Sequence, residues 1–134
     1  MKLGGQSEYW SNLETFMQLA QQLNSLAHLP SNWAAYPADP PNELARRNVE
    51  LLLSRLERSR LAPRRLSAIM DGGVGILFAS GTKRALIEAY NNGEIVVATY
   101  SDAASSDVWM LSLAEGEELS ASATIDKIRV YLAD

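Results

Sequence analysis

The second half of the chain carries closely spaced turn signals. They are Asp71-Gly72-Gly73, Ser80-Gly81-Thr82 and Asn91-Asn92-Gly93. Gly and Asn reach the positive φ angles that tight hairpins require. Runs rich in β-branched and apolar residues flank these turns, at 66–70, 74–79, 83–90 and 94–100. The pattern predicts an antiparallel meander of four strands, with a fifth strand at 108–113 after a loop of small residues.

Side chains alternate along these predicted strands, yet both faces of the sheet are apolar. One face collects Val74, Ile76, Phe78, Ala85, Ile87, Ala89, Ile95, Val97 and Thr99. The other face collects Leu77, Leu86, Tyr90, Val96 and Tyr100. An antiparallel sheet usually has one face on the core and one in water. We therefore expect helices on one face, and a partner or the curvature of the sheet itself to shield the other.

Three helices are predicted around this sheet. Residues 7–27 show apolar side chains at helical spacing, and a capping box at 11–14 allows a start at Ser7 or Ser11. A second helix should run from Asn42 or Glu43 to about Ser59, because Asn is a favourable N-cap. A short third helix should run from about Ser122 or Thr124 to Ala133. The predicted fold is α+β: two N-terminal helices packed on a four- to five-stranded antiparallel meander, with a short C-terminal helix.

Composition limits the class of protein. With 134 residues, of which 47% are apolar, we expect a single domain over residues 1–134 with its own core. Cysteine is absent, which excludes disulfides, zinc knuckles and thiol nucleophiles. No apolar run approaches the roughly 18 residues of a membrane span, and residues 1–6 lack the apolar stretch of a secretory signal. We therefore expect a cytoplasmic protein with no membrane contact.

Few residues are suited to catalysis. His28 is the one histidine, and its place near a predicted helix end favours contact with the helix dipole over acid–base chemistry. Residues 71–75 resemble a phosphate loop superficially, but the lysine and the following helix of a Walker loop are missing. The acidic residues do not follow the spacing of a calcium loop. We expect no catalytic residue, no cofactor and no metal, and hence a protein that is not an enzyme.

Charge is distributed unevenly along the chain. Between Glu43 and Arg65 there are seven arginines and three glutamates, although the whole chain has a net charge of −4. This stretch, from Arg46 to Arg65, is the best candidate for contact with nucleic acid. The pI near 5.0 argues against it, because nucleic-acid modules normally carry a basic excess over the whole domain. An acidic patch on a partner protein is at least as good a match.

An aromatic loop precedes the second helix. Residues 30–41 contain four prolines together with Trp33 and Tyr36. These two aromatics either fill a gap between helix and sheet or form a preformed recognition surface. Because aromatics and arginines dominate the energetics of protein interfaces, five residues are predicted to bind a partner. They are Trp33, Tyr36, Arg47, Tyr100 and Trp109.

The order of motifs resembles a group of small bacterial proteins, most of which have no assigned activity and which are often encoded near mobile elements. The residues that carry the resemblance are Leu29-Pro30, Asn32-Trp33, Tyr36, Ala38, Pro40 and Asp71-Gly72-Gly73-Val74, and the similarity covers about 29–100. Around the tryptophan this chain has Asn32, Ala34 and Ala35 where the group has glycine and aspartate. The resemblance implies a compact module from a bacterium, a phage or a plasmid, used as an antagonist or accessory factor.

Two classes of function follow from these observations. The favoured hypothesis is a non-catalytic protein-binding module, such as an inhibitor, antitoxin-like or immunity-like factor, that masks the surface of another protein. Self-association as a homodimer would also cover the second apolar face. The alternative class is a small ligand-binding protein or hydrolase with a pocket between sheet and helices. Contact with nucleic acid through the arginine-rich stretch is the third and least favoured hypothesis.

Overall fold

Helices pack on one face of a five-stranded sheet in the computed structural model, which describes residues 4–30, 32–34, 38–102, 105–114, 116 and 118–133 (backbone only at 4–11, 105–106 and 118–119). The elements are α1 (Gly4–Ser25), the 3-10 turn η1 (Leu26–His28), α2 (Glu43–Arg58), β1 (Arg65–Ile69), β2 (Gly73–Ser80), β3 (Lys83–Tyr90), β4 (Ile95–Ser101), β5 (Ser105–Met110) and α3 (Glu118–Ala133). The predicted α+β fold is therefore confirmed, and the described residues contain the full five strands of the expected range.

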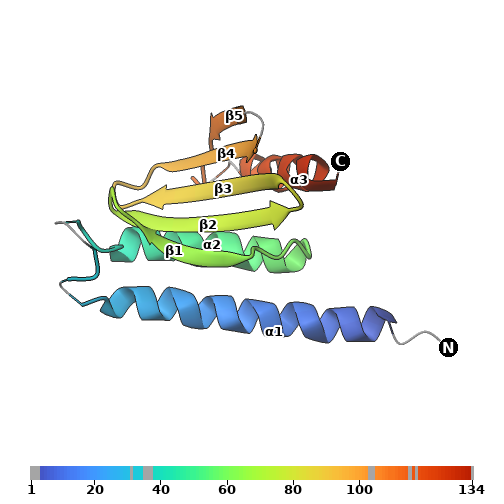
Figure 1. Cartoon of the computed structure of the whole chain (residues 1–134), viewed down its shortest axis with the longest axis horizontal. Coiled ribbons are helices and arrows are strands. Elements are labelled where there is room, and N and C mark those ends of the chain that lie inside the picture. The colour runs from blue at the N-terminus through green and yellow to red at the C-terminus, as the bar shows by residue number, and fades with distance from the viewer. Residues whose placement is uncertain are drawn as a thin grey trace.

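The sheet is an antiparallel meander whose strands lie side by side in sequence order, from β1 to β5 (Figure 1). Tight turns join β1 to β2, β2 to β3 and β3 to β4. Gly73 shows why the first of these turns requires glycine: its φ is +150°, and a Cβ there would stand 2.2 Å from the carbonyl oxygen of Ala89. No other residue type fits so close to the neighbouring strand.

One face of the sheet forms the core with all three helices. The nine alternating residues predicted for that face, from Val74 to Thr99, are each at most 2% exposed. α2 packs on β2 and β3, and α3 packs on the same two strands beside α2. α1 lies alongside α2 at the β1 edge (Figure 1). Because the described helices are all on one side, no helix in that part of the chain covers the other face of the sheet.

The boundaries of α2 and β3 agree with the sequence. Asn42 caps α2 as predicted, since its side-chain Oδ1 accepts a hydrogen bond from the Ala45 backbone N–H at 2.9 Å. α1 begins earlier than predicted, at Gly4, and the side chains of Ser7 and Ser11 lie outside those that the structure describes. Among the described residues, no helix combines the length and the apolar character that crossing a membrane requires.

Two boundaries near the C-terminus differ from the prediction. α3 starts at Glu118 rather than Ser122 or Thr124. Thr124 resembled an N-cap, but its hydroxyl accepts a hydrogen bond from the Trp109 indole N–H at 3.0 Å inside the packed interface. β5 occupies Ser105–Met110 rather than 108–113, because pairing with β4 outweighs the weak strand propensity of the small residues at its start.

A pair of asparagines joins the helical layer to the sheet. Asn91, in the turn between β3 and β4, accepts a hydrogen bond from the Asn42 backbone N–H on its Oδ1 at 2.9 Å. The Asn42 side-chain amide donates to the Asn91 carbonyl at 2.9 Å, and the Asn91 amide donates to the Pro40 carbonyl at 3.0 Å. This pair therefore fixes the start of α2 against one end of the sheet.

Replacing Asn91 by Ala should destabilise the fold by about 1–3 kcal/mol, because two long-range hydrogen bonds of its side chain are lost. Asn92→Ala is the matched control, since the Asn92 side chain accepts only a local bond from Glu94 N–H among the described contacts. Urea unfolding of both variants measures the difference. Equal losses for the two variants would show that the asparagine pair does not hold the helix to the sheet.

Candidate functional site

The uncovered face of the sheet presents apolar side chains that no helix of the described residues covers. We call it the open face. Its apolar members are Ile69, Leu77, Ala79, Leu86, Tyr90, Val96, Ala98, Tyr100, Val108 and Met110. Val108 and Met110, on β5, are 61% and 59% exposed. Contiguous apolar surfaces of this kind on soluble proteins usually mark interaction sites.

The strand register orders the open face into rows that run across the strands. The central row contains Leu77, Leu86, Ala98 and Val108, on β2 to β5. The next row toward the β3–β4 turn contains Gly75, Glu88, Val96 and Met110. The row on the other side contains Ala79, Arg84 and Tyr100. Every strand from β2 to β4 therefore contributes to each row, and the apolar residues are contiguous.

Side chains on this face also pack sideways against one another. Gly75 has no side chain, and the Cβ that it lacks would stand 3.3 Å from Ile69 Cγ2 and 3.5 Å from Leu86 Cδ1. Ile69 and Leu86 thus cover the backbone of β2 at this point. This lateral packing contributes to the half-burial of Leu86 and Ile69, over which no helix of the described residues lies.

Opposite charges lie at the two ends of the open face. Arg84 lies toward the β2–β3 turn, whereas Glu88 and Glu94 lie toward the β3–β4 turn. The exposed Arg65 lies beside Leu77, at the β1 edge of the central row. Tyr90 stands among acidic residues at this second end. Burial, the charge of Glu88 and its hydrogen bond to the tyrosine, and the charges of Asp71 and Glu94 all raise the pKa of the Tyr90 hydroxyl above 10.0.

Both edges of the sheet carry side chains that occupy backbone donors. At β1, the Leu66 backbone N–H donates to Gln22 Oε1 of α1 at 3.0 Å. At β5, the Val108 backbone N–H donates to its neighbour Asp107 Oδ1 at 2.9 Å. Natural proteins block edge strands in such ways to prevent pairing with other chains. A partner is therefore better accommodated on the open face than along an edge.

The residues predicted to bind a partner do not form one surface. Tyr100 is half-buried on the open face, whereas Trp109 pairs with Val97 and lies on the helix-covered face. Arg47 is exposed on α2 and forms an ion pair with Glu43 at 3.3 Å. Trp33 is half-buried in the loop before α2, and Tyr36 lies outside the described residues. Sequence reasoning did not select Val108 or Met110, although their alternation in the predicted fifth strand could have identified them.

Trp109 joins β5 to α3. Besides the hydrogen bond to Thr124, its ring lies beneath the Lys127 ammonium, with 4.1 Å from Nζ to the ring centroid. Lys127 also pairs with Asp107 Oδ2 at 2.5 Å. The hydrogen bond and charge of Lys127 lower the pKa of the Asp107 carboxyl below 3.8. Trp109 is thus held by α3 on the side of the sheet opposite to Tyr100.

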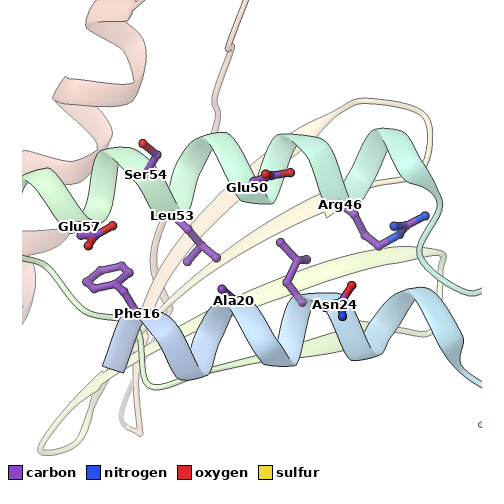
Figure 2. Close-up of a pocket in the computed structure, with 9 residues that line it drawn as sticks. Phe16, Ala20, Asn24, Arg46, Glu50, Leu53, Ser54 and Glu57 are labelled. Carbon is purple, nitrogen blue, oxygen red and sulfur yellow. The ribbon is translucent and has the colours of Figure 1, made fainter. Parts of the chain in front are cut away.

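A groove of about 400 Å³ runs between α1 and α2. Phe16 and Leu53 point into it, and Arg46 lies at the far end from Phe16 (Figure 2). The exposed side chains of Asn24 and Glu50 line its rim. Within the described part of the chain, the buried nitrogens Arg46 Nε and Trp33 Nε1 have no hydrogen-bond partner.

A second groove, of about 720 Å³, lies between α2 and the β4–β5 end of the sheet. Exposed Leu44 and Leu51 of α2 and Met110 of β5 contribute to its wall. Met110 therefore belongs both to this groove and to the open face, so that the apolar surface continues around the end of the sheet.

The arginine-rich stretch is spread over the length of α2. Arg46 and Arg47 lie in its first turns, and Arg64 and Arg65 follow beyond its end. A helix of 16 residues at 1.5 Å per residue is about 24 Å long, so these two pairs are far apart. His28 is exposed at the end of η1 and lines neither groove. Over the described ranges no cluster of three or more acidic or histidine side chains could hold a metal ion.

Comparisons of the chain with protein-family models, with curated proteins and with solved structures gave no significant match. The resemblance to small bacterial and mobile-element proteins therefore stays a prediction.

Acid should weaken the contact between β5 and α3. The folded pKa of Asp107 is lowered, so its contribution to stability is present above about pH 3.8 and is lost as the pH falls through the lower folded pKa. Asp107→Asn removes this contribution at every pH. We expect the variant to be less stable than the original protein near neutral pH and to approach it in acid. Thermal unfolding across that range tests this, and a stability gap that stays constant down to about pH 2 would contradict it.

Proposed function

We propose that this chain is a non-catalytic protein-binding module that acts by covering the surface of another protein chain with its open face. The observation that carries the proposal is the set of apolar side chains on the open face, which no element of the described fold covers. Val108 and Met110 are the most exposed of them. Burying such a surface is favourable by about 25 cal/mol for each Å² of apolar area. An inhibitor, an antitoxin or an immunity factor would use a surface of this kind.

The chemistry of the open face supports a specific partner. Its centre is apolar, with Leu77, Leu86 and Ala98, and its ends carry charges of opposite sign. Interfaces commonly combine an apolar centre with a polar rim, and the rim charges select orientation and partner. Tyr100 is the aromatic most suited to anchor a partner here, because tyrosine contributes large contact area together with a polar hydroxyl.

A photo-crosslinking amino acid in place of Val108 tests whether the open face contacts protein in the cells that make it. The matched control is the same substitution at Val130, which is 64% exposed on α3. We expect one discrete protein adduct from position 108 and none from position 130. Adducts of the same kind from both positions, or none from position 108, would contradict the proposal.

Ligand binding remains the second candidate because of the groove between α1 and α2. Its volume of about 400 Å³ falls within the usual range of small-molecule sites, and it combines an apolar floor with the guanidinium of Arg46. Native mass spectrometry of the chain purified from its own cells separates the two candidates. A bound small molecule that Leu53→Arg abolishes, without effect on the adduct at position 108, would assign ligand binding to this groove.

A further inference from the structure

The open face is self-complementary about a line across its strands. The central row is flanked on β3 by Arg84 on one side and Glu88 on the other, each two residues from Leu86. Rotating the face by 180° about a line through the central row exchanges these two positions. A second copy placed by that rotation would set Glu88 against the partner's Arg84, and Arg84 against the partner's Glu88.

We propose that the occupant of the open face is a second copy of this chain, packed sheet on sheet about a two-fold axis that crosses β3 at Leu86. The inference rests on the proposed function and names the partner at the same surface. Isologous two-fold contacts are the commonest form of homo-oligomer, and each patch then contacts itself. Stacked antiparallel sheets with roughly aligned strands, about 10 Å apart, are a standard packing mode.

The apolar pairs made by this rotation are matched in size. On β2, the partner's Ala79 would lie over Gly75, where the side chains of Ile69 and Leu86 cover the backbone. On β4, Val96 meets the partner's Tyr100, which places an aromatic ring on an aliphatic side chain. The central residues Leu77, Leu86 and Ala98 meet their own copies. The exposed Arg65, at the β1 edge of this row, also meets its own copy, so the charge complementarity is confined to the inner strands. Across the proposed interface, β4 therefore pairs the larger Tyr100 with the smaller Val96, and β3 pairs the opposite charges of Arg84 and Glu88.

The ion pair has donors available for it. Arg84 Nη1 donates to the carbonyls of Gly81 at 2.7 Å and Lys83 at 2.9 Å, which holds the side chain at the end of the face. A guanidinium has five N–H donors, so the remaining nitrogens can bind a carboxylate side-on. Two copies of the Glu88–Arg84 pair would then fix the rotation angle of one sheet on the other.

The area is enough for a specific but modest dimer. Five strands about 4.8 Å apart and three rows about 6.7 Å apart give a flat footprint of about 500 Å² per copy. Two copies together bury about 1,000 Å², which is near the lower limit for specific interfaces. We therefore expect reversible dimerisation in the micromolar range.

Charge exchange between copies tests the proposal directly. In sedimentation equilibrium of the purified chain, Arg84→Glu and Glu88→Arg should each weaken dimerisation at least about tenfold, because like charges then face each other. A 1:1 mixture of the two variants should dimerise as tightly as the original protein, since both facing pairs are again opposite in charge. Circular dichroism of each variant confirms folding. A monomeric original protein at about 200 μM, or a mixture no tighter than either variant, would overturn the proposal.

A second measurement is independent of these charges. The chain has no cysteine, so Leu86→Cys creates a single thiol on the proposed axis. Sheets about 10 Å apart hold two such thiols beyond the reach of a disulfide, and a short bismaleimide reagent is used instead. We expect rapid covalent dimers from Leu86→Cys and few from the more exposed control Val130→Cys. Equal yields would contradict a two-fold axis at Leu86.

The failure of this inference can be told apart from failure of the proposed function. A chain that stays monomeric while position 108 crosslinks to a different protein in cells retains the proposed function and loses the second copy as partner. A monomeric chain with no adduct at position 108 loses both. An adduct with twice the mass of the chain, together with rescue in the mixture of charge variants, supports both.

Discussion

The strand register of the meander is the constraint on which the rest of this structure depends. Pairing Ile76 with Ile87, and Ile87 with Val97, places every second residue of three strands under the helices. A shift of one residue in any strand would move its whole buried set to the opposite face. The same register collects Leu77, Leu86 and Ala98 on the uncovered face. The core and the proposed binding surface are therefore two consequences of one pairing pattern.

Much of this arrangement could be read from local signals in the sequence. The turn residues around Gly73 and Asn91 define the hairpins, and Asn42 marks the start of α2. The apolar character of both sheet faces was also visible, because alternation assigns each residue of a strand to a face. What local patterns could not show was the start of β5 and the role of Thr124. Both depend on tertiary partners, since β5 pairs with β4 and the Thr124 hydroxyl accepts a hydrogen bond from Trp109 inside α3 instead of capping the helix.

The candidate site was only partly predictable for a related reason. Residue type alone selected Trp109 and Tyr100 together, but the register places them on opposite faces. The proposed pairing of Glu88 with Arg84 of a second copy depends on three-dimensional symmetry that no linear motif encodes. The blocked edges at Leu66 and Val108 likewise come from side chains whose partners only the fold reveals. Local alternation therefore identifies the surface, whereas the fold shows how that surface is oriented and bordered.

Oxidation of methionine side chains offers the most direct test that the open face is covered when the protein works. Met110 on the open face and Met17 on α1 are both 59% exposed in the single chain. Met17 therefore serves as the internal reference for the oxidation rate of Met110. Brief hydroxyl-radical exposure followed by mass spectrometry measures both rates in one sample. We expect oxidation of Met110 to slow relative to Met17 as the protein concentration rises through the micromolar range. Equal rates at every concentration, in cells as well as in the purified protein, would contradict the account.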